Sequence, residues 1–370
     1  MKTVRSLIRR DVVWSVFFVA LAFMSLFFFI GFLEELEGAT RRGDSLWRAA
    51  LAAGLELPSR FYELFPISVL IGTIYAMARL AQSSEFTILR TGGLGPGRAL
   101  SLLLNLGLLM AALTFLTGEF IAPLGELQAA RMRASGDGQT TVGEAGAWLK
   151  ERRHLPDGDR VFSINVQGTD SQGDLHGIRI FEHDDDGRLL RRIEAASGHA
   201  GREGEQSVWQ LRKARETVWP LDEQQPVITR SLESLNWNTT LDDGVVAAAT
   251  SPIGSMSTLE LWRYSQHLTL QEQTSQRYEL QFWKRAIYPF ACIVMMALAL
   301  PFAYLHARAG GISLKVFGGI MLGISFVLLN NVVGHLTLLR DWTPWLAASV
   351  PSLIYLALSL AAFGWLVRYR

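Results

Sequence analysis

The glycine-rich stretch GGLGPGR (92–98) is the segment of the chain that most resembles a phosphate-binding loop. A nucleotide-binding loop of that kind ends in Gly-Lys-Ser or Gly-Lys-Thr, because the lysine and the hydroxyl engage phosphate and magnesium. This stretch lacks that ending, and no strand-like segment precedes it. It therefore predicts a turn, and we do not expect this chain to bind ATP by that route.

Other catalytic patterns are also missing from the sequence. There is no H-E-x-x-H or G-x-S-x-G motif, and the seven histidines are scattered. The single cysteine, Cys292, lies in an apolar run, so no disulfide forms within the chain. We expect no catalytic residues, no metal site and no cofactor, and a formal net charge of +1 gives no sign of a nucleic-acid partner.

A short amphipathic element, SSEFTILRTGG (83–93), stands between two apolar runs. Its serines suit a helix N-cap, and Glu85 in the first turn is favoured by the helix dipole. Phe86 and Leu89 share one face at i, i+3 spacing, and Gly92 suits the C-terminal stop. The pattern alone is compatible equally with anchoring in the membrane interface and with docking onto another protein.

The elements around this segment are long apolar runs. Each is free of Asp, Glu, Lys and Arg, and each can cross a hydrocarbon core of about 30 Å, which takes roughly 20 helical residues. Five of them are Trp14–Leu33, Ala99–Gly118, Ala286–Leu305, Val316–Gly334 and Trp342–Val367. Leu64–Ala78 is shorter, and its flanking apolar residues extend it to a sixth span. The fold class predicted is a polytopic helical membrane protein with six transmembrane helices.

Basic residues in the short segments predict the orientation of these helices. One side carries eleven: Lys2, Arg5, Arg9, Arg10, Arg79, Arg90, Arg98, Arg308, Lys315, Arg368 and Arg370. The other carries five: Arg41, Arg42, Arg48, Arg60 and Arg340. Both termini and the 83–93 element are therefore expected in the cytoplasm.

About 140 residues between the third and fourth runs have the composition of a soluble domain. Segments of alternating apolar and polar residues, such as 160–166, 177–183, 207–213 and 227–237, are separated by Asp-Gly and Gly-Asp turns. This period of two predicts an antiparallel, jelly-roll-like β domain across the membrane from the termini. The predicted organisation is 1–137 for the first membrane half, 138–256 for the β domain, and 257–370 for an amphipathic connecting helix and the second membrane half.

The chain resembles the LptF/LptG family of bacterial lipopolysaccharide export permeases, and its LptG branch in particular. The resemblance lies in LAQSSEFTILRTGGL, which is similar to the family's coupling helix, in GEFIAPLGELQAARMRA (118–134), and in RYELQFWKRAIYPFACIVMMALAL (277–300). The order of three helices, a β domain and three helices matches over nearly the whole chain.

The resemblance implies a subunit of an ABC-type exporter in the inner membrane of a Gram-negative bacterium. It implies pairing with an LptF-like chain, a cytoplasmic dimer of an LptB-like ATPase that binds the ATP, and a single-span LptC-like subunit. The substrate would be lipopolysaccharide, extracted from the outer leaflet, and the β domain, facing the periplasm, would pass it to a periplasmic bridge protein.

Site residues follow from the same resemblance. Glu85, Phe86, Ile88, Leu89 and Arg90 would dock the ATPase. Arg131 and Arg133 would contact lipid phosphates near the cavity mouth. Some family members have a lysine late in the first helix, where this chain has uncharged FFFIGFL, and Arg41 and Arg42 are the candidate replacements. The alternatives are the LptF paralogue of the same complex, a membrane anchor for the β domain without transport, and a membrane-embedded enzyme.

Overall fold

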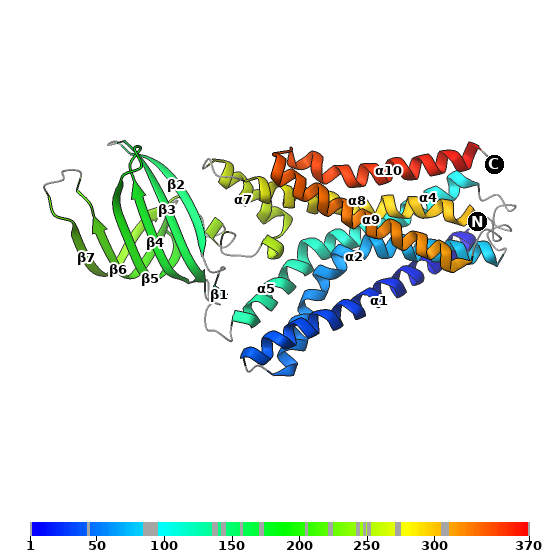
Figure 1. Cartoon of the computed structure of the whole chain (residues 1–370), viewed down its shortest axis with the longest axis horizontal. Coiled ribbons are helices and arrows are strands. Elements are labelled where there is room, and N and C mark those ends of the chain that lie inside the picture. Colours follow the sequence, from blue (N-terminus) through cyan, green and yellow to red (C-terminus); the bar gives the residue numbers. More distant parts are fainter. Residues whose placement is uncertain are drawn as a thin grey trace. The chain divides into compact units, whose positions relative to one another are not determined.

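The computed structural model divides the chain into two compact units: Met1–Gly125 with Glu279–Arg370, and Glu126–Tyr278. The residues that it describes are 2–42, 45–83, 95–134, 140–141, 146–155, 158–169, 174–203, 206–220, 225–241, 245–246, 249, 253–270, 275–304 and 311–368. The first unit is helical and the second contains the sheet (Figure 1).

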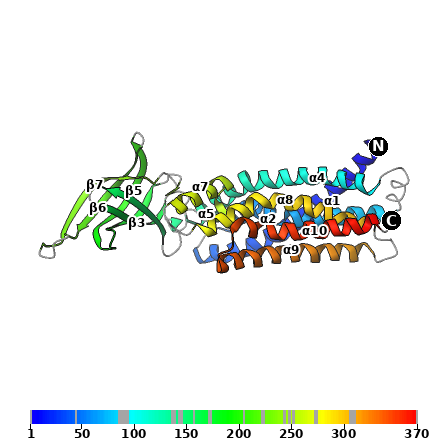
Figure 2. The same cartoon turned by 90° about the horizontal axis from the view of Figure 1, so that it is seen from above.

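Six helical stretches of the described chain are long and apolar enough to cross a membrane, which confirms the predicted fold class. The helices are α1 (Lys2–Arg42), α2 (Leu46–Gln82), α4 (Pro96–Leu116), α5 (Ala122–Ala134), α8 (Gln276–Tyr304), α9 (Ile312–Arg340) and α10 (Pro344–Arg368). A π-helical turn, Thr117–Ile121, joins α4 to α5. The first residues of α1 and the last of α10 lie at the same end of the helical unit (Figures 1 and 2).

Helix α2 is the centre of the helical unit, with 78% of its most apolar stretch buried. Glycines allow neighbouring helices to approach it closely: a Cβ at Gly72 would lie 2.5 Å from the Cα of Val16 in α1. Gly323 of α9 similarly faces Ile67 of α2. Because lipid tails are as apolar as the side chains, helices in membranes associate through such close packing.

Helices α1 and α9 are the least covered, with 11% and 22% of their apolar stretches buried. Large apolar side chains such as Trp14 and Phe18 on α1 and Leu314 and Phe317 on α9 are exposed. In a membrane these faces contact lipid or another subunit.

The second unit is built around one antiparallel sheet. Its strands are β1 (Thr140–Thr141), β2 (Ala147–Leu155), β3 (Gly158–Thr169), β4 (Leu175–His183), β5 (Leu189–Glu203), β6 (Gln206–Val218) and β7 (Ile228–Thr239). The order is β1-β3-β4-β5-β6-β7, and β2 also pairs with β3. The alternating segments noted in the sequence coincide with β3, β4, β6 and β7, which confirms the inserted β domain.

The sheet curls, with β6 and β7 at an angle to β3 (Figure 2). Its concave side is closed by aromatic packing, since the rings of Phe162 and Trp237 are 5.9 Å apart and those of Trp209 and Trp237 are 5.4 Å apart. All three side chains are buried. The sheet is therefore a roll with a packed aromatic interior.

The two margins of the roll are joined through a buried carboxylate, Glu151 of β2. Its side chain accepts hydrogen bonds from Arg153 at 2.8 and 2.9 Å, from the Thr239 hydroxyl at 2.8 Å, and from the Thr240 amide and hydroxyl at 2.8 Å each. The Arg153 guanidinium also donates to the Asn238 carbonyl at 2.6 Å. This group, Glu151 with Arg153, Thr239 and Thr240, is called the β2–β7 clasp below.

The clasp predicts that the roll is sensitive to acid. Burial by itself raises the pKa of Glu151, but the charge and hydrogen bonds of Arg153 and Thr240 outweigh it and hold this pKa below its ordinary value of 4.5. A carboxylate with a depressed folded-state pKa stabilises the fold above the unfolded pKa. That stability is lost as the pH falls below 4.5 and through the folded pKa.

Glu151→Gln is expected to lower the free energy of unfolding of the β domain by about 3 kcal/mol at neutral pH, because it leaves Arg153 without its buried partner. It should also remove much of the acid dependence. Urea unfolding of the purified chain, followed by near-ultraviolet circular dichroism over a pH series, measures both. Glu233→Gln, at an exposed position of β7, is the matched control. An equal loss in both variants would contradict a stabilising clasp.

The predicted connecting helix is present as two helices, α7 (Thr258–Leu270) and the start of α8. Helix α7 begins with a capping box: the Ser257 amide donates to the Glu260 carboxylate at 2.7 Å, and the Glu260 amide donates to the Ser257 hydroxyl at 3.2 Å. Its buried face carries Leu261, Tyr264 and Leu268, the i, i+3, i+7 spacing of an amphipathic helix.

Candidate functional site

The predicted docking element lies almost wholly outside the described residues, which stop at Ser83 and resume at Gly95. Glu85, Phe86, Ile88, Leu89 and Arg90 therefore remain predictions from the sequence. The structure does describe the C-terminal end of α2, which leads to this element. Ser83 donates from its amide and its hydroxyl to the Arg79 carbonyl, at 3.0 and 3.2 Å.

An ion pair fixes this end of α2 to α1. The Arg79 guanidinium lies 2.8 Å from the Asp11 carboxylate, and the aspartate side chain is only 16% exposed. Asp11 is near the start of α1, and Arg79 is in the last turn of α2. The ion pair therefore links to α1 the end of α2 that leads to the predicted docking element.

Neutralising this pair by Asp11→Asn is expected to weaken coupling between a partner that binds residues 83–93 and the rest of the helical unit. The charge-swapped double variant, Asp11→Arg with Arg79→Asp, should recover at least part of the loss, because it restores the attraction with the signs exchanged. Transport per ATP hydrolysed in the reconstituted complex is the measurement. A swap no better than the single variants would argue against a role for the pair.

A second cluster of polar groups surrounds the π-helical turn. A Cβ at Gly118 would lie 2.3 Å from the ring of Tyr62, so the ring lies directly on the glycine backbone. The Tyr62 hydroxyl donates to the Arg285 carbonyl at 3.2 Å, and the Tyr288 hydroxyl donates to the Glu63 carbonyl. The two tyrosine rings are 5.1 Å apart. These contacts fasten α2 and α8 to the turn, and π-helical turns are often found at functional sites.

Cations also lie at this position of α8. Arg285 is 9% exposed. The amine of Lys284 packs against Gly334 of α9, because a Cβ built at that glycine would lie only 2.3 Å from the amine nitrogen. Ionisable residues within membrane-spanning helices are costly and commonly functional. Sequence reasoning did not name this cluster, although the Lys-Arg pair at the edge of the fourth apolar run was a visible signal.

The four arginines proposed for lipid contact lie on two helices. Arg41 and Arg42 are the last two residues of α1, and Arg131 and Arg133 are in the last turn of α5. The positions of their side chains are outside what the structure describes, so their contacts with lipid phosphates remain predictions.

Comparison with known proteins identifies what this architecture is. The family model of the lipopolysaccharide export system permease LptF/LptG matches residues 6–366. The chain belongs to the LptF/LptG family.

Relatives within this LptF/LptG family are similar over nearly the full length. The LptG permease protein of Haemophilus influenzae is 24% identical over 353 residues, which cover 95% of each chain. The LptG permease proteins of Escherichia coli strains K12 and O6:H1 are each 26% identical over 339 residues, covering 91% of each chain. These matches confirm the family expected from the coupling-helix motif and the likeness to its LptG branch. The chain is a multi-pass membrane protein and a permease subunit of lipopolysaccharide export.

Proposed function

We propose that this permease subunit extracts lipopolysaccharide from the outer leaflet of the inner membrane and passes it through its β domain to a periplasmic bridge. The match to the LptF/LptG family over residues 6–366 is the observation that carries the proposal. Both termini and residues 83–93 would lie in the cytoplasm and the β domain in the periplasm.

The energy would come from a partner. We propose that ATP is bound and hydrolysed by a separate dimeric, LptB-like ATPase, which docks on the element containing Glu85, and that this chain holds no cofactor of its own. The ion pair of Asp11 and Arg79 supports this, because it ties the helix leading to that element into the helical unit.

A second permease chain and a single-span subunit complete the proposed assembly. The exposed apolar faces of α1 and α9 suit contact with an LptF-like chain and an LptC-like helix, since side chains such as Phe18 and Leu314 are largely exposed in the part of the chain that the structure describes. The proposed cavity between the two permease chains would receive the lipid, with Arg131 and Arg133 near its mouth.

Two other assignments make different predictions. If the chain were the LptF paralogue, a purified complex would pair it with an LptG-like chain. If it were only an anchor for the β domain, it would support no transport with any partner.

Reconstitution tests the proposed function. The chain, an LptF-like partner, an LptC-like subunit and the ATPase are placed in vesicles loaded with lipopolysaccharide, and transfer to a soluble periplasmic acceptor is followed with and without ATP. We expect transfer that requires both ATP and this chain. Equal transfer without the chain would overturn the proposal.

A further inference from the structure

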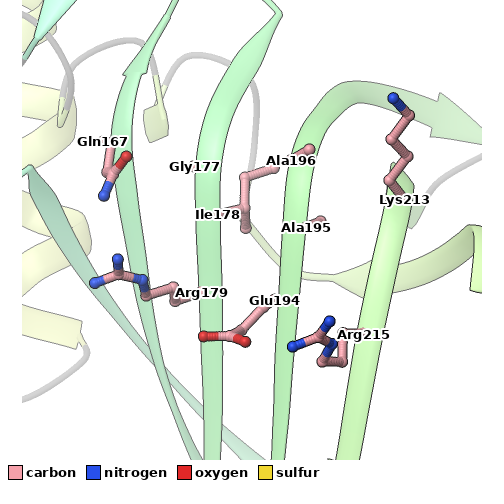
Figure 3. Close-up of a pocket in the computed structure, with 9 residues that line it drawn as sticks. All are labelled: Gln167, Gly177, Ile178, Arg179, Glu194, Ala195, Ala196, Lys213 and Arg215. Carbon is pink, nitrogen blue, oxygen red and sulfur yellow. The ribbon is translucent and has the colours of Figure 1, made fainter. Parts of the chain in front are cut away.

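A hollow of about 310 Å³ lies on the surface of the β domain, away from the clasp. Figure 3 shows Arg179 and Arg215 on either side of Glu194, with Gln167 and Lys213 farther along the strands. The lining also includes Gly177 and Ala196.

This hollow is on the face of the sheet opposite to the packed interior. Arg179 stands between the buried Ile178 and Ile180, and Glu194 stands between the buried Ile193 and Ala195. Because successive side chains of a strand point to opposite faces, the charged residues point away from the core. The hollow is therefore separate from the aromatic interior of the roll.

The sheet is locally irregular where the hollow lies. On one side of it β4, β5 and β6 pair through Ile178, Ala195 and Ala214, and on the other side through Leu175, Gly198 and Leu211. These two rows, both buried, are three residues apart in each strand, whereas regular alternation would bring only even separations to one face.

Each strand has one additional residue between the two rows, namely Gly177, Ala196 and Lys213, and the pairing register is the same on both sides of it. Gly177 and Lys213 occupy the row between, with φ of +62° and +49°, the left-handed conformation that such irregularities use. The hollow lies at this row, since Gly177, Ala196 and Lys213 all line it. A non-glycine residue in that conformation is uncommon, and it places the Lys213 side chain at the rim.

The charges around the hollow are unbalanced. Glu194 already forms an ion pair with Arg192. Arg179, Lys213 and Arg215 are exposed, and none of the three has an ion-pair partner among the other residues that the structure describes. Because Glu194 is already paired with an arginine, the guanidinium groups of Arg179 and Arg215 and the ammonium group of Lys213 give the site a net positive charge.

We propose that this hollow binds a phosphorylated sugar. The planar guanidinium groups of Arg179 and Arg215 match phosphate oxygens, with Lys213 as a third cation. The Gln167 amide and the Glu194 carboxylate supply the donor and acceptors that sugar hydroxyls require. A hollow of about 310 Å³ has room for a sugar ring as well as a phosphate, since one water occupies about 30 Å³.

An acidic polypeptide is the competing occupant, and Glu194 argues against it. A carboxylate accepts hydrogen bonds from hydroxyls, which a phosphorylated sugar supplies and the side chains of a glutamate-rich peptide do not. The phosphorylated sugars of lipopolysaccharide are the source that the proposed function supplies, and the identification of the natural ligand rests on that function. Binding of the sugar itself does not, so the two can fail separately.

Glucosamine 1-phosphate, inorganic phosphate, glucosamine and a glutamate-rich peptide are the probes. Hydrogen–deuterium exchange of the purified full-length chain locates binding, and calorimetry measures the dissociation constants. We expect glucosamine 1-phosphate to slow exchange in peptides covering Gly177 and Lys213, with weaker effects of phosphate or glucosamine alone. In the double variant Arg179→Gln with Arg215→Gln, the dissociation constant should rise at least about ten-fold, as expected for lost charge-assisted hydrogen bonds.

A matched double variant, Arg188→Gln with Arg230→Gln, removes the same charge elsewhere on the sheet and should bind like the unmodified chain. Ala196→Glu, which leaves both arginines in place and adds a negative charge to the lining, should abolish the protection. Equal binding of phosphate and glucosamine 1-phosphate would overturn the sugar assignment. Stronger protection by the peptide would replace it with a protein partner, and protection that persists in the Arg179 and Arg215 variant would place binding elsewhere.

Discussion

Gly72→Val is expected to prevent the native packing of α1 against α2. A Cβ there would lie 2.5 Å from the Cα and 2.6 Å from the amide nitrogen of Val16, and 2.9 Å from the carbonyl carbon of Ser15. All three are backbone atoms, so no side-chain rotation relieves the contact and α1 itself must shift. We expect a loss of about 3 kcal/mol or more, at the upper end of overpacking in a well-packed core.

Gly54→Val in the same helix is the control. No atom lies within 4 Å of a Cβ at that position, and the intrinsic helix preference of the substitution is the same in both places. Gly319→Val should fall between the two, because the Cβ there meets the tip of the Ile74 side chain, which can rotate. Thermal denaturation of the purified chain in detergent measures the order, and equal stability of the Gly72 and Gly54 variants would show that the helices pack differently.

Glu85→Ala is expected to weaken docking of the ATPase and, as a result, to reduce transport. Under the proposed function, the segment containing Glu85 docks the ATPase, and a carboxylate facing a basic groove makes a directional, charge-assisted contact. Removing it should weaken association with the ATPase about ten-fold and reduce ATP-dependent lipopolysaccharide release by at least as much. Co-purification of the ATPase and the vesicle transfer assay measure the two effects.

Glu85→Asp keeps the charge on a shorter side chain, and a partial recovery in that variant would show that charge as well as reach matters. Thr87→Ala, at the neighbouring position but outside the predicted docking set, is the matched control. Unchanged release by the Glu85→Ala variant would exclude the docking assignment. Lost association together with unfolding of the chain would indicate a structural role instead.

The helical part of the fold could be predicted because its signal is local. Each run such as Trp14–Leu33 is apolar over the length that a membrane requires, and its helix follows from composition alone. The helices are longer than the runs, because α1 extends through charged residues to Arg42 and a helix continues beyond the hydrocarbon region. Glycine contacts such as that of Gly72 with Val16 could not be predicted, since they pair residues far apart in the sequence.

The β domain was predictable where alternation is regular, as in β3, and not where it is interrupted. Strand β5 spans Leu189–Glu203, but the irregular row at Ala196 and the run SGHAG break its period of two. The alternation in β2 is obscured for another reason. Glu151 is buried, but a charged residue at its position predicts a side chain that faces solvent. Its partners Thr239 and Thr240 are almost ninety residues away, and only the closed roll brings them together.

The residues of the candidate site were proposed mainly from resemblance, and they stay predictions. The residues of the 83–93 element carry a motif, whereas the arginines of the hollow do not: Arg179 and Arg215 are thirty-six residues apart and look like ordinary solvent-facing positions of alternating strands. The pair of Asp11 and Arg79 likewise joins two helix ends that only the fold places side by side.

The shared irregularity of β4, β5 and β6 also limits how this domain can change over evolutionary time. Deleting Lys213 would restore strict alternation in β6, but β5 would keep its additional residue. The pairing of β5 with β6 would then shift by one residue on one side of the deletion. A viable change of length must therefore occur in all the neighbouring strands together, which single insertions and deletions do not achieve. The backbone of the hollow therefore changes only as a unit, whereas a substitution at its rim replaces one side chain and leaves the strand pairing intact.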